Sequence, residues 1–226
     1  MELSRPIRLN QDTNLLKLVA IITMMIDHMG KMLFPQYPIF RIIGRIAFPL
    51  FSYCMAVGCT YTHDFKRYVG RVALLFLISQ PLYVLALGGG WFKFNILLAL
   101  VAGMLVVGSL HRGKIGLAAV ALAAGFIFQD YLDYGFRGIL LMLLFYALYD
   151  KPALSFIAVG GFMFLWGMQY GGYSIGGLRF STQMFALMAL PLIYIPTHSG
   201  LKLNKYVFYA FYPAHLLVIY ILCQIF

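Results

Sequence analysis

Residues 18–30 read LVAIITMMIDHMG, an apolar run of helical length that nevertheless carries an aspartate and a histidine. The rest of the chain is similarly apolar: of its 226 residues, 62% are hydrophobic and 11% are charged. Soluble domains carry about 25% charged residues, so these charges are too few to cover a water-facing surface. We therefore predict an all-α, polytopic integral membrane protein that contacts the membrane lipids directly.

Clusters of turn-forming or charged residues divide the chain into apolar segments. A helix that crosses a bilayer needs about 20 mainly apolar residues, which leaves room for about nine short spans in one transmembrane domain, residues 1–226. The first twelve residues are polar and lack the pattern of a cleaved signal peptide, so we expect the first span to anchor the protein. The predicted spans are 14–34, 39–60, 68–87, 94–110, 114–128, 136–149, 152–169, 181–196 and 206–225.

The distribution of lysine and arginine predicts the orientation, because these residues are more frequent in cytoplasmic loops. With the N-terminus inside, eleven of the seventeen fall on the cytoplasmic side and six on the outer side. We therefore predict a cytoplasmic N-terminus and an external C-terminus. The net charge of +10 does not indicate a nucleic-acid partner, because the cations punctuate the loops and form no single patch.

The three cysteines, Cys54, Cys59 and Cys223, all lie inside apolar segments. Their odd number and their spacing match neither a disulfide framework nor a zinc site. Free cysteine behaves as a small buried hydrophobic residue, so we expect core positions and no metal.

Asp27 and His28 lie about two-thirds of the way along the first span. A charged side chain at the bilayer centre costs about 2.5–3.5 kcal/mol, so each polar group there needs a partner or a task. Adjacent helical residues point about 100° apart, and Asp27 is therefore poorly placed to orient His28. We expect Asp27 to pair with Lys31 or with an arginine of another span, and a purely structural role for both residues is the alternative.

The second span begins with RIIGRIAFPLF, residues 41–51. Arg41 and Arg45 are four residues apart, on one helical face that continues through Phe48 and Ser52. Gly44 would allow another helix or a ligand to approach closely, and the proline at position 49 would permit a kink. Paired guanidinium groups suit phosphate or carboxylate, whereas snorkelling to the interface would explain Arg41 better than the deeper Arg45.

Residues 129–138, QDYLDYGFRG, hold three further charges. Asp133 and Arg137 are four residues apart and are expected to form a helical ion pair. Asp130 has no local partner in the sequence. The segment lies at the start of a predicted span.

The last span contains KYVFYAFYPAHLL, residues 205–217, in which Tyr209, Tyr212 and His215 share one face. Pro213 is expected to interrupt the backbone beside His215 and to open a polar pocket. Aromatic stripes usually pack in a core, but an apolar span has little structural need for an imidazole. His215 is therefore the stronger functional candidate.

The predicted orientation places these residues in the middle or outer half of the membrane. We therefore predict one polar cavity, open to the outside, as the functional centre. Its predicted members are Asp27, His28, Arg41, Arg45, Asp130, Asp133, Arg137 and His215.

Four motifs carry a resemblance that covers essentially the whole chain. LKLVAIITMMIDHMG (16–30), RIIGRIAFPLF (41–51), DYGFRGILLMLLFY (133–146) and KYVFYAFYPAHL (205–216), in this order, resemble the TraX family. That family is associated with N-terminal acetylation of conjugative pilin and is related to acyltransferase-3-like membrane proteins. The resemblance implies a multi-pass protein of the bacterial cytoplasmic (inner) membrane. It also implies acyl transfer from cytoplasmic acetyl-CoA to an acceptor of unknown identity (peptide amine, glycan or lipid) at the outer face.

The resemblance also implies roles for the motif residues. His28 would be the general base or nucleophile, supported by Asp27, with His215 as a second catalytic or positioning group. The substrate-binding candidates are Arg41, Arg45, Asp130, Asp133, Arg137 and Tyr212, and the two arginines of the second span would bind donor phosphate or stabilise an oxyanion. Histidine and arginine suit this chemistry, because acyl transfer needs a base active near neutral pH and a donor for the developing negative charge.

Two other functions remain open on the residues alone. Buried Asp, His and Arg side chains could form the relay of a small proton-coupled transporter or channel, although no internal repeat indicates repeat symmetry. The charges could also serve only to match helices in a non-catalytic assembly factor. The chain contains neither an H-E-x-x-H nor a G-x-S-x-G motif, so a metalloprotease or a serine hydrolase is not indicated.

Overall fold

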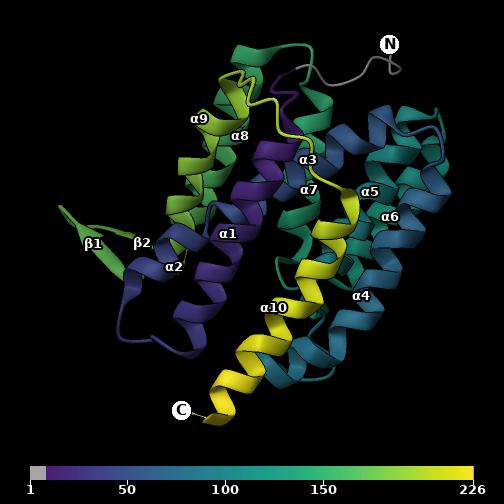
Figure 1. The fold of residues 1–226 in the computed structure, drawn as a ribbon. Coiled ribbons are helices and arrows are strands. Elements are labelled where there is room, and N and C mark those ends of the chain that lie inside the picture. The colour runs from purple at the N-terminus through teal and green to yellow at the C-terminus, as the bar shows by residue number, and fades with distance from the viewer. Residues whose placement is uncertain (1–8, 170, 226) are drawn as a thin grey trace.

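The computed structural model describes residues 9–169 and 171–225, and helices dominate it (Figure 1). All nine apolar segments predicted from the sequence are helical over most of their length, so the all-α prediction is confirmed. The elements are α1 (Thr13–Met32), α2 (Pro38–Gly44), α3 (Ala47–Tyr61), α4 (Phe65–Leu87), α5 (Ile96–His111), α6 (Ile115–Ile127), η1 (Gln129–Tyr131), α7 (Gly135–Ala147), α8 (Pro152–Gly167), η2 (Thr182–Ala189), α9 (Leu190–Tyr194) and α10 (Lys205–Ile225).

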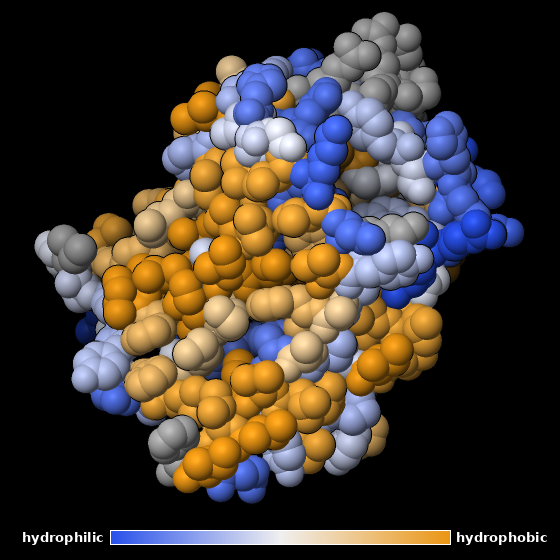
Figure 2. All heavy atoms as spheres, viewed as in Figure 1, coloured by the Kyte–Doolittle hydropathy of each residue, from blue (hydrophilic) through white to orange (hydrophobic). Residues whose placement is uncertain are grey.

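Length and composition identify a membrane protein. Within residues 9–169 and 171–225, three helical segments are long and apolar enough to cross a bilayer: Pro38–Tyr61, Phe65–Leu87 and Tyr206–Ile225. Five further apolar helical segments are shorter, with 10–17 residues. Large hydrophobic side chains are exposed around the bundle, and on the face shown in Figure 2 they form a broad apolar area below a hydrophilic end. The number of spans and the direction of insertion stay predictions.

The second predicted span, 39–60, is divided into α2 and α3 by a tight turn at Arg45 and Ile46. The backbone N–H of each of these residues bonds to a carbonyl three positions earlier. Pro49 explains the tightening, because a proline cannot donate the bond that the carbonyl of Arg45 would accept in a regular helix. The predicted kink therefore lies one turn before the proline.

Two local features differ from the prediction. An antiparallel hairpin, β1 (Tyr173–Ile175) and β2 (Leu178–Phe180), lies between α8 and η2. Gly176 and Gly177 form its turn with φ of 59° and 84°, which only glycine adopts without strain. The expected break at Pro213 is wrong, since α10 runs through this residue without interruption. A membrane helix tolerates proline where neighbouring groups compensate for the missing bond, and α10 packs against both α1 and α4.

The core lies along α3, which contacts α1, α5 and α7. Ten of its 15 residues are buried, including Phe48, Tyr53, Cys54 and Cys59. The prediction of core cysteines is thus confirmed for these two, while Cys223 is half-buried. Because α10 packs beside α1, the last helix of the chain brings His215 to the polar end of the first. The start of α1 and the end of α10 lie at opposite ends of the bundle (Figure 1).

Candidate functional site

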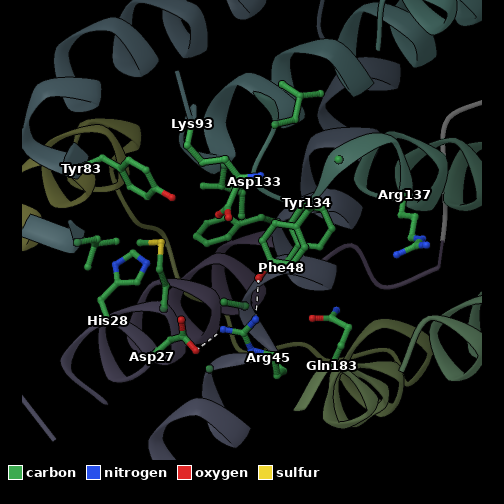
Figure 3. Close-up of a pocket in the computed structure, with 18 of the residues that line it drawn as sticks. Asp27, His28, Arg45, Phe48, Tyr83, Lys93, Asp133, Tyr134, Arg137 and Gln183 are labelled. Carbon is green, nitrogen blue, oxygen red and sulfur yellow. Dashed lines mark hydrogen bonds and ion pairs between the residues drawn. The ribbon is translucent and has the colours of Figure 1, made fainter. Parts of the chain in front are cut away.

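A polar cavity of about 530 Å³ opens between α1, α2, α3, α4 and the loop that precedes α7. Eight of the nine site residues predicted from the sequence line it. The side chains labelled in Figure 3, among them Asp27, Asp133 and Arg137, surround one space. The ninth, His215, lies outside the lining and contacts it through His28. The eight are Asp27, His28, Arg41, Arg45, Asp130, Asp133, Arg137 and Tyr212. The structure thus brings together residues that are up to 185 positions apart in the chain.

Asp27 is shared by the two arginines of the second span. Arg41 Nη1 donates to Asp27 Oδ2 at 2.6 Å, and Arg45 Nη2 donates to Asp27 Oδ1 at 2.5 Å. Arg45 also donates from Nε to the carbonyl of Arg41 and from Nη1 to the hydroxyl of Tyr134. Of the two partners expected for Asp27, the arginine is therefore the one found, while Lys31 donates instead to the carbonyl of Leu87.

Gly44 makes this ion cluster possible. A Cβ atom at this position would overlap the side chain of Asp27, so any other residue would push α2 away from α1. Both oxygens of the carboxylate are used, and the Asp27 side chain is only 10% exposed. The cluster of Asp27, Arg41 and Arg45 therefore has the properties of a structural clamp between the first two spans.

His28 is held by His215, which lies 187 positions later. His28 Nδ1 and His215 Nε2 are 2.9 Å apart, and the two rings are within 13° of coplanar with their centroids 5.1 Å apart. These values describe two imidazoles that meet edge to edge in one plane. That geometry aligns an N–H of one ring with a nitrogen lone pair of the other.

The backbone settles which nitrogen carries the proton. His215 Nδ1 lies 3.0 Å from the carbonyl of Phe211, and a carbonyl only accepts, so this nitrogen is protonated. In neutral His215, Nε2 is then an acceptor, and His28 must donate from its Nδ1. Neutral His28 consequently keeps its lone pair on Nε2, a nitrogen that has no hydrogen-bond partner among residues 9–169 and 171–225.

The residues around η1 do not pair as expected. Asp133 precedes α7 and lies in a turn, so the helical register that would have joined it to Arg137 is absent, and no ion pair links these two described residues. The low polarity of the surrounding protein raises the pKa of the Asp133 carboxylate, although Arg45 and Lys93 act in the opposite direction. The backbone carbonyl of Asp130 accepts a hydrogen bond from Lys93 Nζ at 3.1 Å.

Sequence reasoning missed several residues of the cavity. Tyr134 stacks on Phe48 with centroids 3.9 Å apart, and Trp166 meets Tyr134 edge-on. Lys93 and Gln183 also line the space. Tyr134 lies inside a motif that was quoted for its charges. Nothing in the sequence links positions 93, 166 and 183 with that motif, because the segments that carry them meet only in the folded chain.

A second, apolar hollow of about 90 Å³ adjoins the cavity. The two share the side chains of Met24, Phe51, Ile96 and Tyr212. The apolar hollow continues along α1, α4 and α10 toward the end of the bundle where α1 begins, and Lys17 is part of its lining. Tyr212 is 5% exposed, and its hydroxyl has no hydrogen-bond partner among the described residues, so an unused donor lies at the junction.

Comparison with known proteins identifies one matching family and two relatives. The family model described as "TraX protein" matches residues 12–223. An uncharacterized protein of Rickettsia prowazekii (strain Madrid E) is 32% identical over 157 residues, which cover 65% of this chain and 61% of that relative. A probable fimbrial assembly protein, FimC of serogroup H1, from Dichelobacter nodosus is 25% identical over 89% of this chain and 91% of its own length. No solved structure matches.

Proposed function

The chain belongs to the TraX family, and from this premise and the geometry of the cavity we propose that it is a membrane-embedded acetyltransferase. In this proposal an acetyl group passes from cytoplasmic acetyl-CoA to an amine or hydroxyl acceptor that enters the polar cavity from outside a bacterial inner membrane. The name of the Dichelobacter nodosus relative makes a fimbrial subunit amine one acceptor worth testing. The observation that carries the proposal is the free Nε2 of His28 at the cavity wall.

The proposed reaction needs a base beside the acceptor nucleophile. His28 Nε2 would accept the proton of the attacking amine or hydroxyl while a new C–N or C–O bond forms at the thioester carbonyl. The C–S bond would then break, and the proton held by His28 would pass to the departing thiolate to give free CoA. His215 would keep His28 in the tautomer that this step requires, as a partner fixed to a backbone carbonyl does for other catalytic histidines.

The donor would reach the cavity through the apolar hollow. The apolar lining of this hollow suits a slender, largely uncharged thioester arm, for which it would have to widen, and Lys17 lies at the end where the anionic part of CoA would remain. The Tyr212 hydroxyl lies where the two hollows meet. It could donate a hydrogen bond to the carbonyl oxygen as negative charge develops there.

Because Asp27 engages Arg41 and Arg45, the proposal changes their expected roles. Each of the three nitrogens of Arg45 donates a hydrogen bond within the protein, so only two of its five N–H groups could still reach a phosphate. We therefore propose that this pair positions α1, and with it His28, instead of binding the donor.

The test uses purified protein in nanodiscs with acetyl-CoA and a panel of amine and hydroxyl acceptors. Release of free CoA thiol is expected from the unaltered protein, and His28→Ala is expected to lower the rate about 10²–10⁴-fold, the usual contribution of a positioned general base. His198→Ala is the matched control, because this histidine is exposed and does not line the cavity. The melting temperature should be unchanged in His198→Ala, and the rate of His28→Ala is compared per folded molecule, because this substitution leaves His215 Nε2 without its hydrogen-bond donor.

Two results would overturn the proposal. One is equal turnover by His28→Ala and the unaltered protein. The other is an absence of acetyl-CoA binding together with proton or solute flux in proteoliposomes, which would favour the transporter.

A further inference from the structure

Arg137 differs from every other arginine that lines the cavity, because it has no hydrogen bond or ion pair with any residue that the structure describes. It lies in the first turn of α7 and is half-buried. The neighbouring carboxylates do not neutralise it: Asp27 is taken by Arg41 and Arg45, and Asp133 forms no pair with it. A partly desolvated guanidinium without a counter-charge is a ready anion-binding group.

The surroundings of Arg137 supply the rest of a binding subsite. Gln183, at the start of η2, lines the same cavity, and in the view of Figure 3 its side chain and that of Arg137 both lie on the side away from His28. The Gln183 side chain has no partner in the described chain. Trp166 adds an aromatic surface held edge-on by Tyr134 and Phe48. The cavity as a whole is lined by five lysines and arginines but only three aspartates, which favours an anionic occupant.

Figure 3 places Arg137 and His28 at opposite sides of the cavity, with Phe48 and Tyr134 between them. We propose that Arg137 and Gln183 bind an anionic group, a carboxylate or a phosphate, on the acceptor, while the acceptor's amine or hydroxyl lies at His28. The acceptor is thus an elongated molecule with a nucleophile at one end and an anion at the other. This inference rests on the proposed acetyl transfer for the identity of the nucleophile, but not for the binding of the anion.

Simple ω-amino acids test the inference. The acceptors β-alanine, γ-aminobutyrate and ε-aminocaproate carry an amine and a carboxylate at increasing separation, and their carboxamides have the same length without the charge. We expect kcat/KM to be about tenfold or more higher for the carboxylate of the best length than for its amide, as for a charge-assisted hydrogen bond. Arg137→Gln should abolish this preference, and Arg137→Lys should restore part of it.

Arg179→Gln is the matched control, because this arginine is exposed on β2 and does not line the cavity. The corresponding aminoalkyl phosphates, tested beside the carboxylates, show which anion is preferred. Equal rates for charged and uncharged acceptors in the unaltered protein would overturn the inference and leave acetyl transfer intact. A loss of CoA binding in Arg137→Gln, measured by calorimetry, would also overturn it, since Arg137 would then hold the donor.

Binding without turnover separates the two proposals. Equilibrium binding of labelled ε-aminocaproate or of its phosphate analogue, lost in Arg137→Gln and kept in Arg179→Gln, would support the anion subsite even in a protein that transfers no acetyl group. If Arg137→Gln fails to fold, Gln183→Leu is measured in its place. A preference unchanged in Gln183→Leu would contradict the shared subsite.

Discussion

Asp27 and His28 are neighbours on α1, yet their side chains differ in how many of their hydrogen-bonding atoms have a partner. Each carboxylate oxygen of Asp27 is bound by an arginine. His28 bonds His215 through one ring nitrogen, and its other ring nitrogen has no partner among the described residues. Arg45 and Arg137 show the same contrast, since every nitrogen of Arg45 donates a hydrogen bond and Arg137 has no hydrogen-bond partner among the residues that the structure describes. An unpaired polar group inside an apolar bundle is costly. A polar group whose hydrogen bonds are all made within the protein, here called saturated, therefore indicates a structural role. A group with an unused donor or acceptor indicates a place where a ligand could bind.

The largest effect expected from this contrast follows from Asp27→Ala. The substitution leaves two guanidinium groups without their carboxylate, and that of Arg45 is only 12% exposed. Breaking a buried ion pair by removing one partner costs about 3–5 kcal/mol, so we expect a large fall in the free energy of unfolding. Denaturant titration in detergent micelles measures it.

The control for Asp27→Ala is an exposed ion pair of the same chain. Arg67 and Asp64 pair at 3.3 Å with side chains 75% and 53% exposed, and such pairs contribute about 0–1 kcal/mol. Arg67→Ala should therefore change stability little. Similar losses for both substitutions would show that the Asp27 cluster is not the clamp described above.

The second prediction concerns His215, which acts on the reaction only through His28. Removing the partner that orients a metal-binding histidine costs about 10–100-fold in activity. We expect a loss of the same order in kcat for His215→Ala, with little change in the acceptor KM. His215→Gln keeps an acceptor oxygen for His28 Nδ1 and should recover part of the rate. A purely structural role predicts that both variants lose stability and that Gln gives no recovery of kcat.

The sequence predicts the fold and the membership of the site, but not the bonding state of each site residue. Hydrophobic segments predict the helices, because the period and length of apolar runs reflect local chemistry. The costly residues also predict a common polar space, and the cavity contains all of them except His215. Their roles in chemistry stay predictions.

Sequence patterns could not predict which polar side chains of the site would find a partner and which would not. Asp133 was expected to pair with Arg137 because the two are four apart, but a turn precedes α7 and removes the helical register. The contact of His28 with His215 spans 187 positions, and no local pattern encodes such a distance. The hairpin at 173–180 depends on the conformation of two glycines, and it lies between the predicted spans 152–169 and 181–196, where no element was expected.

The third prediction applies the rule of saturation to the end of the bundle opposite the cavity. Asn10 is fully buried, and its side-chain amide donates to the carbonyls of Leu192 and Ile195 and to the hydroxyl of Thr197. Asn10→Ala removes these bonds and should cost about 1–2 kcal/mol of unfolding free energy, toward the lower part of the usual range, because Ile195 is exposed and water can reach that carbonyl. The rate of acetyl transfer per folded molecule should not change.

The smallest effect is expected at Asp12, a saturated carboxylate near the surface. Asp12 Oδ2 accepts a hydrogen bond from the backbone N–H of Ser199 at 2.6 Å, and Oδ1 caps α1 through the N–H of Leu15. These bonds lower the pKa of Asp12 below its ordinary value of 3.8, with the bond from Ser199 as the largest cause.

A pKa that is lower in the folded than in the unfolded chain favours folding while the carboxylate is charged in both states. The stabilisation by Asp12 is therefore fully present above the ordinary pKa near 4. It is lost as the pH falls through the lower, folded value. Melting temperatures of the unaltered protein and of Asp12→Asn should differ slightly at pH 6 to 7 and converge as the pH drops below about 4. A difference that stays constant over this range would show that the Asp12 carboxylate, although bonded, contributes nothing through its charge, and saturation alone would then be a poor guide to structural roles at the surface.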